Sequence, residues 1–408
     1  MGRAHGVTGL TIPPWAREVR PAFSRVLARE EIYLANHSLG RPPDAVLSNI
    51  QAFATSWMDE LDESWSSDRW LGEVATFRGH VAALLGLPSE NLVVTKTSAG
   101  QGLRAVLNAF PADRPIRVVT TSGEFDSIDF ILRAYRDAGR IMLDFVPPTA
   151  SEHGVPIYEA DALKARLQSG VDLLVISAVY FGTGQVMQGL SEIVAAAHEA
   201  GAVVVVDAYH ALGVLPFDQI ANGADFVIGG CYKYLRGGPG ACFLGLHPRI
   251  AGDAAWKTVD TGWFAKKDTF SYQRTEHAER WPGGDGWQES TPPIVTAYQA
   301  NPGLATVRAI GIDQIRAHNL KLQAHLIEGL QRSGVPVFAP QNPLEWGAFV
   351  LVPHPGAGSF ASALKGNGVN TDARGGFVRL GPDFLNTPEE LEEAAQRVAL
   401  TWRQHTAG

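Results

Sequence analysis

Length, composition and charge exclude several classes of protein. The chain has 408 residues, 45% hydrophobic and 19% charged, with a net charge of −8. It can bury one or more sizeable cores, and its mild acidity without a basic run argues against nucleic-acid binding. No apolar run approaches a membrane span, and the N-terminus lacks the apolar core of a signal peptide. Two cysteines, Cys231 and Cys242, suggest neither a disulfide framework nor a metal site, and they fit a reducing cytoplasm.

In the middle of the chain, short apolar runs alternate with helical patterns over about 200 residues. Residues 1–45 are rich in Pro, Gly and Arg and are predicted to form an N-terminal arm. Short apolar runs follow at 91–95, 116–121, 141–146, 171–177, 202–207, 224–229 and 241–246. Several are almost continuous in Val, Ile and Leu, as is typical of strands buried on both faces. Helical patterns such as 158–169 and 191–200 lie between them. We therefore predict an α/β large domain over 46–295 with a mainly parallel seven-stranded sheet.

The pattern changes after residue 250. Residues 252–293 hold four of the ten Trp but few regular signals, and an amphipathic stretch with helical spacing follows from Ile312 to Leu330. A last helix is predicted to begin after Thr387, with Pro388 at its first position and Glu390 completing a capping box. These features predict a smaller C-terminal α+β domain over 296–408.

The strongest chemical signal is Asp207 followed 26 positions later by Lys233. Asp207 ends the run VVVV, at the carboxyl end of a predicted strand, where open α/β sheets bind ligands. Lys233 precedes a Gly-Gly-Pro-Gly turn, in which glycine lets the backbone approach a ligand. A Schiff base would relieve the cost of a lysine charge beside a buried strand, and the acid could protonate a pyridine nitrogen. Alternatively, Lys233 is solvated and Asp207 caps a helix.

Together with other short motifs, this pair of residues resembles the sequences of pyridoxal-phosphate enzymes in the class V aminotransferase group. Within that group the sequence is most similar to kynureninase. The group is suggested by Asp207-Ala-Tyr-His210 and by Tyr232-Lys233-Tyr-Leu-Arg-Gly-Gly-Pro-Gly. Kynureninase is suggested by Gly262-Trp263-Phe and Thr291-Pro-Pro. The resemblance spans roughly residues 30–390. Further motifs occur in the same order as in the family: Asn36-His-Ser38, Ser177-Ala-Val-Tyr-Phe-Gly-Thr-Gly-Gln and Val378-Arg379-Leu. It implies the fold type I of these enzymes and pyridoxal 5′-phosphate (PLP) as cofactor.

The resemblance also assigns roles around the cofactor. Lys233 would form the Schiff base and later move the Cα proton, and Asp207 would hold the pyridinium proton. His210 would lie near that carboxylate or the ring hydroxyl. Tyr232 would reach the phosphate and act in proton transfer near the leaving group. The remaining cofactor positions are Phe125, stacked on the pyridine face, Ser177, and Ser98 with Ala99, which would hold the phosphate where a helix begins near Gln101.

Substrate binding and the partner subunit follow from the same resemblance. Arg379 would clamp the substrate carboxylate with its planar fork, and Ser38 would lie beside it. Trp263 and Thr291 would contribute from the partner subunit of a homodimer. Alternatives remain open for several of these residues. Phe125 and Trp263 could be packing residues, Ser98 could be only a helix cap, and Arg379 could pair with Asp383 or Glu390.

The aryl-binding half of the site departs from the kynureninase pattern. No His lies in residues 57–70, where the family keeps one that faces the substrate. Thr291 replaces an amide, Ala99 replaces a phosphate-binding Thr, and the acid after Phe125 is displaced to Asp126 or Asp129. We therefore expect an enzyme that cleaves the Cβ–Cγ bond of a 3-acyl-alanine by hydrolysis, with a side chain of the kynurenine type or a modified analogue of it. L-Kynurenine itself is expected to be a poor substrate; alternatively, Trp65, Trp70 and Thr291 rebuild an equivalent pocket and kynurenine is accepted.

Other reactions of the same fold stay open. They are C–S cleavage by a lyase or desulfurase, for which neither cysteine lies in an evident mobile loop, and amino transfer in secondary metabolism. A protein that binds the cofactor without catalysing a reaction is disfavoured, because cofactor binding alone does not need an arginine such as Arg379 to hold a substrate carboxylate.

Overall fold

Seven strands form the central sheet, in the order β2-β10-β9-β8-β7-β3-β4. The computed structural model describes residues 10–150, 154–167, 170–277, 279–338, 340 and 342–406. The strands are β2 (Val93–Lys96), β3 (Ile116–Thr121), β4 (Ile141–Val146), β7 (Leu173–Ser177), β8 (Val203–Asp207), β9 (Phe226–Gly230) and β10 (Cys242–Leu246). Each falls within or next to one of the seven apolar runs. The predicted mainly parallel sheet is confirmed: β9, β8, β7, β3 and β4 run parallel, and β10 runs antiparallel to β2 and β9.

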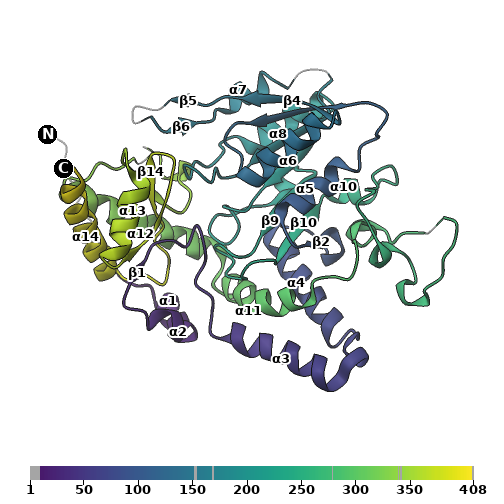
Figure 1. Ribbon diagram of the computed structural model, residues 1–408, viewed down its shortest axis with the longest axis horizontal. Helices are drawn as coiled ribbons and strands as arrows, with labels where there is room; N and C mark the ends of the chain where they lie inside the picture. The colour runs from purple at the N-terminus through teal and green to yellow at the C-terminus, as the bar shows by residue number, and fades with distance from the viewer. Residues whose placement is uncertain are drawn as a thin grey trace.

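Helices cover both faces of this sheet (Figure 1). Successive residues of a strand point to opposite faces. In β7, Leu174 and Ile176 therefore join one buried cluster, and Leu173 and Val175 join another. The helices are α3 (Ala45–Glu60), α4 (Trp70–Leu84), α5 (Ala99–Leu107), α6 (Asp126–Asp137), α7 (Ala160–Lys164), α8 (Leu190–Glu199), α9 (Gln219–Asn222), α10 (Pro248–Ala251) and α11 (Ile294–Ile310). Burial on both faces explains why the strand sequences lack a polar alternation.

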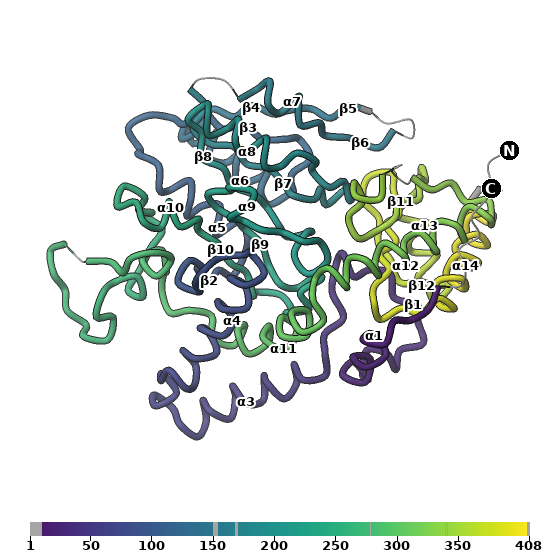
Figure 2. The backbone as a smooth tube through the Cα atoms, turned by 180° about the vertical axis from the view of Figure 1, so that it is seen from behind, coloured from purple at the N-terminus to yellow at the C-terminus, as the bar shows by residue number. Residues whose placement is uncertain are grey.

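A second, smaller unit stands at one end of the sheet (Figures 1 and 2). Its antiparallel sheet has the order β11-β14-β13. Its elements are α12 (Ile312–Arg332), β11 (Val350–Pro353), α13 (Ala357–Gly366), β12 (Val369–Asn370), β13 (Asp372–Arg374), β14 (Phe377–Leu380) and α14 (Pro388–Thr406). The capping box of α14 is present: Glu390 N donates to Thr387 Oγ1 at 3.1 Å, and Thr387 N donates to Glu390 Oε2 at 3.2 Å.

The N-terminal segment packs on this smaller unit. It contains α1 (Pro14–Val19), α2 (Ser24–Leu27) and β1 (Ile32–Tyr33), and β1 pairs in parallel with β12. Residues 1–9 of the predicted arm and 168–169 of the predicted helix at 158–169 lie outside the described residues. Helix α11 packs against α3 and α4 of the large unit, and the domain boundary at residue 295 stays a prediction.

The remaining elements are short. A hairpin of β5 (Thr149–Ala150) and β6 (Pro156–Ile157) extends from the large unit toward the smaller one (Figure 2). The 3-10 helices are η1 (Arg20–Phe23), η2 (Leu61–Ser64), η3 (Glu90–Leu92), η4 (Trp263–Ala265), η5 (Thr269–Ser271), η6 (Gly283–Trp287) and η7 (Pro343–Glu345). No helix in the described part of the chain has the length and apolar character needed to cross a membrane.

Candidate active site

A cavity of about 410 Å³ opens at the carboxyl ends of β7 and β8. Open α/β sheets bind ligands at this edge. Eight of the residues predicted from the sequence line the cavity: Ser98, Ala99, Phe125, Ser177, Asp207, His210, Tyr232 and Lys233. They come from five separate stretches of the chain, and the folding of the sheet brings them together.

Lys233 is buried in this cavity, three residues after β9. Its Nζ lies 2.5 Å from Nε2 of His210 and 4.6 Å from the centre of the Tyr209 ring. Burial lowers the pKa of Lys233 to about 7, although the negative charge of Asp207 opposes this shift. About half of the amine is therefore neutral near pH 7 and the neutral share grows above it, and a neutral amine is the nucleophilic form.

Asp207 ends β8 and is also buried. Its Oδ1 accepts a hydrogen bond of 2.8 Å from the backbone N–H of Tyr209. Burial raises the pKa of Asp207 to about 6, and both that hydrogen bond and the charge of Lys233 oppose the rise. A cationic group bound in the cavity would lower this pKa again, because opposite charges favour the ionised carboxylate.

The beginning of α5 forms a cradle for an anion. Ser98 is the N-cap residue, and its Oγ accepts from Gln101 N at 3.1 Å. Ser98, Ala99 and Gly100 line the cavity at this helix end, where backbone N–H groups and the helix dipole favour negative charge. Arg104 lies one turn further along α5 and lines the same cavity. Our sequence analysis missed Arg104, although its spacing from Gly100 places both residues on one helix face.

Phe125 borders the same cavity. Its ring packs edge-on against Phe181, with 5.2 Å between the ring centres, and its centre lies 5.6 Å from Lys233 Nζ. The residue before it, Glu124, is buried and was not foreseen. Glu124 accepts hydrogen bonds of 2.6 Å from the hydroxyls of Ser177 and Thr121, and burial raises its pKa to about 7. Glu124 therefore fixes the orientation of Ser177 at the cavity wall.

Arg379 and Ser38 lie on the side of the smaller unit and are not among the residues that line the cavity. Arg379 Nε donates to Asp372 Oδ1 at 2.8 Å, and Nη2 donates to Asp372 Oδ2 at 2.5 Å. Its Nη1 donates to the carbonyl of Phe181 at 2.5 Å. Ser38 Oγ also donates to Asp372 and accepts from Arg379 Nη2 at 3.3 Å.

The alternative partners considered for Arg379 have other contacts. Asp383 pairs with Arg236 at 2.5 Å, and Glu390 belongs to the capping box of α14. Asp372 was not foreseen as the partner of Arg379. Asp372 binds the Nε–Nη2 edge of the guanidinium, while the Nη1–Nη2 edge meets the Phe181 carbonyl and the Ser38 hydroxyl.

Trp263 and Thr291 lie away from the cavity within this chain. Trp263 packs against Phe264 and Tyr272, with ring centres 4.6 and 6.1 Å apart. Thr291 lines a separate groove of about 540 Å³ together with Phe53, Trp57, Leu61, Asp62, Trp65, Trp70, Ile294 and Val295. Their assignment to a partner subunit's cavity stays a prediction.

Comparison with known proteins identifies the family. The family model for class V aminotransferases matches residues 32–368. The chain belongs to the class V aminotransferase family. It is 26% identical over 322 residues to an uncharacterised aminotransferase of Bacillus subtilis, covering 79% of this chain and 82% of that protein. It is 27% identical over 361 residues to the kynureninase of Pseudomonas fluorescens, covering 84% and 82%.

Solved structures agree in fold. The apo cysteine desulfurase of Thermococcus onnurineus superposes with a TM-score of 0.81 at 19% identity, covering 98% of this chain and 100% of that one. The cystine C–S lyase C-DES superposes with a TM-score of 0.80 at 19% identity, covering 92% and 99%. The predicted fold type I is confirmed. At this identity the likeness concerns the fold alone.

The cofactor of this class V family member is PLP, and the cavity has the groups that PLP requires. Lys233 offers an amine, Asp207 an acid for a pyridine nitrogen, and the beginning of α5 an anion cradle. His210 Nδ1 is buried and has no hydrogen-bond partner among the described residues. A ligand oxygen in the cavity would satisfy it, since an unpaired buried polar atom is costly. The residues present therefore fit PLP.

Proposed function

We propose that this class V enzyme hydrolyses the Cβ–Cγ bond of a 3-acyl-L-alanine. In the balanced reaction, water and the acyl-alanine give L-alanine, a carboxylate and one proton. The observation that carries the proposal is the burial of Lys233, His210 and Asp207 in one cavity, next to an arginine suited to a substrate carboxylate. The motifs that the sequence shares with kynureninase suggest that the Cβ–Cγ bond is the one cleaved.

Lys233 and Asp207 divide the proton chemistry. When bound, PLP supplies an electron-withdrawing pyridinium ring that makes the substrate Cα–H acidic. Asp207 would keep the ring nitrogen protonated. Lys233 would hold the cofactor aldehyde through its amine and, once released by the substrate amine, would move the proton at Cα. His210 stays neutral, because burial and the neighbouring Lys233 lower its pKa well below the usual value.

Arg379 would orient the substrate through its carboxylate. Asp372 occupies the Nε–Nη2 edge of the guanidinium. A substrate carboxylate would therefore bind along the Nη1–Nη2 edge, replacing the contact with the Phe181 carbonyl. Ser38 lies 3.3 Å from Nη2 and would donate to the same carboxylate after turning from Asp372.

Arg104 would complete the phosphate site. Ala99 carries no hydroxyl, so this chain lacks a donor that related enzymes use at that position. The guanidinium of Arg104 borders the same end of the cavity and has no hydrogen-bond or ion-pair partner among the described residues. Arginine binds phosphate through charge-assisted hydrogen bonds. With Ser98 and Tyr232, it would balance the phosphate charge.

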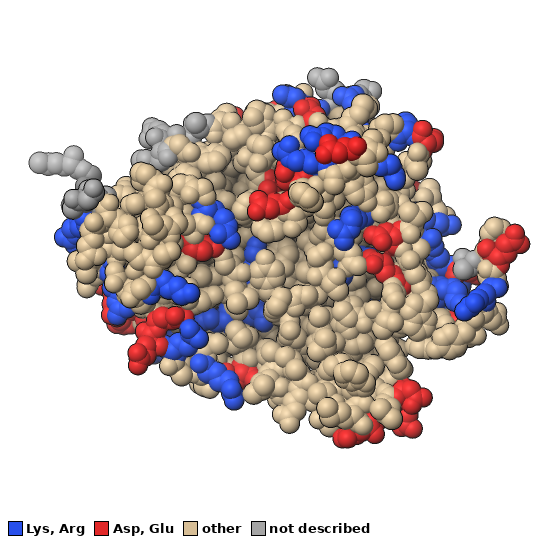
Figure 3. Space-filling view, in the orientation of Figure 1, with Lys and Arg blue, Asp and Glu red and all other residues tan. Residues whose placement is uncertain are grey.

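A homodimer would bring Trp263 and Thr291 to the cavity of the partner subunit. In Figure 3 the surface over α11 and the middle of α3 carries few charged side chains. Exposed apolar side chains of α3, η2 and α11 are Leu47, Trp57, Met58, Leu61 and Val295. An apolar surface of this kind marks protein–protein contacts in soluble proteins. We expect this dimer in a reducing cytoplasm, since Cys231 and Cys242 are unpaired thiols.

The groove around Thr291 would then receive the substrate side chain. Trp65 and Trp70, which meet edge-on with 5.0 Å between ring centres, form its wall with Thr291. This wall offers aromatic surface and one hydroxyl. The imidazole and amide donors of the kynureninase pattern are missing from it. The natural substrate therefore differs from kynurenine in its acyl group.

Product analysis with the holoenzyme tests the reaction class. L-Kynurenine, 3-hydroxykynurenine, aliphatic 3-acyl-alanines, L-cysteine and L-cystine would be incubated separately, and all products identified. The proposal expects L-alanine and a carboxylate from at least one acyl-alanine. Release of sulfide or persulfide would instead indicate the C–S lyase alternative, and a 2-oxo acid formed with an amino acceptor would indicate amino transfer. Cys231 and Cys242 are both buried, which disfavours a mechanism with a mobile cysteine.

A further inference from the structure

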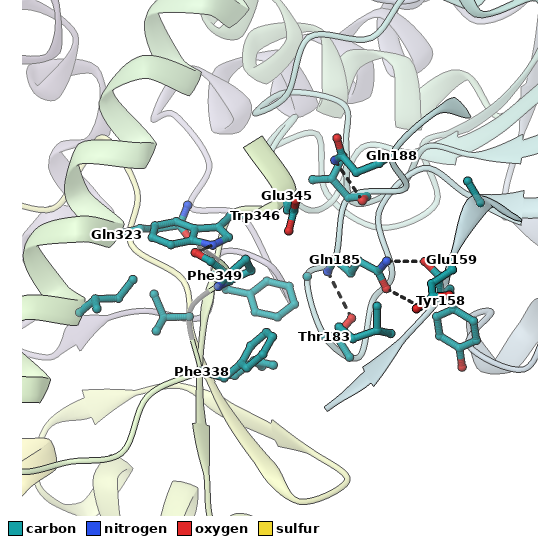
Figure 4. A pocket seen from close by; sticks show the side chains of 18 of the residues that line it. Tyr158, Glu159, Thr183, Gln185, Gln188, Gln323, Phe338, Glu345, Trp346 and Phe349 are labelled. Atoms are coloured by element: carbon teal, nitrogen blue, oxygen red, sulfur yellow. Dashed lines mark hydrogen bonds between the residues drawn. The ribbon is translucent and has the colours of Figure 1, made fainter. Parts of the chain in front are cut away.

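A second cavity of about 510 Å³ lies between the large and small units. Figure 4 shows Tyr158, Glu159, Thr183 and Gln185 on one side, and Gln323, Phe338, Trp346 and Phe349 on the other. The first group follows β6 and β7 in the large unit. The second belongs to α12 and to the segment leading into β11. None of these residues lines the cavity that holds Lys233.

Backbone hydrogen bonds join the two sides of this interdomain cavity. Gly347 N donates to Gly184 O at 2.6 Å, and Val186 N donates to Glu345 O at 3.1 Å. A side chain at position 184 would need φ of +75° and would meet the Phe349 ring at 3.1 Å, so glycine permits this close approach. Arg316 donates to the carbonyl of Gly347 at 2.9 Å and that of Trp346 at 2.5 Å. These hydrogen bonds therefore hold the segments of the cavity wall in fixed positions.

The charge of the lining selects one class of ligand. Apolar surface comes from the rings of Phe338, Trp346 and Phe349. The carboxyl-bearing residues that line the cavity are Glu159, Asp161 and Glu345, whereas no described lining residue is Lys, Arg or His. Asp161 pairs with Lys164 at 2.7 Å and Glu159 accepts from Thr149. The carboxylate of Glu345 has no such partner among the described residues.

Gln323 lines this cavity and has a buried acceptor atom without a donor in the described part of the chain. Its Nε2 donates to Asn319 Oδ1 at 2.8 Å and to Gly347 O at 2.9 Å, which fixes the orientation of the amide. Its Oε1 is buried and has no hydrogen-bond partner among the described residues, and the residue is 1% exposed. A buried acceptor without a donor is unfavourable, so a ligand N–H would be stabilising there.

We propose that the interdomain cavity binds a small aromatic amine in its protonated form. The rings would pack on the aromatic body, and the ammonium N–H would donate to Gln323 or Glu345. An anion of the same size would meet the carboxylates of Glu159 and Glu345 and bind more weakly.

The same cavity is connected to the substrate side of the active site. The ring of Phe349 lies 6.2 Å from that of His210, and the Arg379 guanidinium lies 5.3 Å from the Phe349 ring centre. Phe181, whose carbonyl binds Arg379, precedes the wall residues Thr183 and Gly184. A bound amine would hold these segments in place and alter substrate affinity through Arg379. This effect on substrate affinity rests on the proposed function.

Crystals of the holoenzyme soaked with 4-bromo-N,N-dimethylbenzylamine would locate the site by anomalous scattering. A tertiary amine cannot condense with an aldehyde, so it cannot react with PLP. We expect bromine in the interdomain cavity, and calorimetry in solution should show at least ~10-fold weaker binding of 4-bromophenylacetate. Bromine elsewhere only, or equal binding of the anion, would overturn the proposed site.

Variants separate binding from regulation. Glu345→Gln should weaken amine binding ~3-fold or more, whereas Glu328→Gln should not change it, because Glu328 is a half-exposed residue of α12 that lies near Arg332 and does not line the cavity. An unchanged Kd in Glu345→Gln with full folding would contradict the charge argument. Saturating amine should change KM for the amino-acid substrate and leave the cofactor absorbance unchanged. Binding without an effect on KM would overturn the coupling alone, and the binding result is independent of which reaction the enzyme catalyses.

Discussion

Lys233 and His210 share a short contact of 2.5 Å between Nζ and Nε2, and both side chains are buried. Two positive charges at this distance would repel, so at least one group must be neutral. Burial lowers the pKa of Lys233 to about 7 and that of His210 well below its usual value. The imidazole is therefore neutral at physiological pH, where it shares a hydrogen bond with the Lys233 amine.

This contact predicts how cofactor capture depends on pH. In the cofactor-free protein the capture rate should rise about tenfold per pH unit below pH 7 and become constant above it, because only the neutral Lys233 amine attacks the aldehyde. Stopped-flow absorbance between pH 5.5 and 9.5 measures this rate. Pyridoxal, which lacks the phosphate, serves as a control for phosphate titration. A rate that keeps rising to pH 9.5 would show an ordinary lysine.

Asp207→Asn should abolish most turnover while some PLP stays bound. An amide cannot stabilise the protonated ring nitrogen as a carboxylate does. We expect a loss of at least ~100-fold in kcat, of the order seen when positioned groups in proton transfer are removed. The cofactor absorbance band and kcat would be measured together, with the exposed Asp137→Asn as control. Near-normal turnover in Asp207→Asn would refute the role.

Arg379→Ala should raise KM for the true substrate far more than it changes PLP binding. Truncating one partner of a buried, charge-assisted pair costs ~2–5 kcal/mol, or ~30-fold and more in affinity. Arg379→Lys should recover only part of this loss, because a lysine lacks the planar fork. Steady-state kinetics and the cofactor spectrum check both statements. Loss of PLP with intact substrate affinity would assign Arg379 to the fold or the cofactor.

Arg104→Gln should weaken PLP binding ~10-fold or more and leave pyridoxal binding unchanged, since only PLP carries the phosphate. Equilibrium binding to cofactor-free protein measures both ligands. Arg133→Gln on the neighbouring α6 is a matched control, because that guanidinium already pairs with Asp129 at 2.7 Å. An equal loss for PLP and pyridoxal would indicate a structural role for Arg104 instead.

L-Kynurenine should be a poor substrate. A site that lacks partners for a polar substrate group can discriminate by up to ~10⁴-fold, and the Trp65, Trp70 and Thr291 wall lacks the family's imidazole and amide. Values of kcat/KM for L-kynurenine and 3-hydroxykynurenine decide the point. A value of ~10⁴ M⁻¹s⁻¹ or above, within the ordinary enzyme range, would show that this wall replaces the usual pocket.

Local patterns in the sequence were sufficient for the strands, whereas most cofactor-facing residues were assigned by resemblance to the family, and their roles stay predictions. The run before Asp207 is apolar at every position because β8 is covered on both faces, and the same burial makes the acid at its end conspicuous. The capping box at Thr387 and Glu390 is likewise a local arrangement, since both partners lie within one helical turn. Such features need no knowledge of distant contacts.

The tertiary structure alone decided which distant groups meet. Asp372 rather than Asp383 pairs with Arg379, because β13 and β14 run antiparallel and place positions 372 and 379 opposite each other. Glu124 meets Ser177 because their strands β3 and β7 are neighbours in the sheet. The interdomain cavity depends on the approach of Gly184 to Gly347, which are 163 positions apart. Hydrophobic periodicity describes each segment by itself, whereas charge pairing and cavities depend on how segments are placed together.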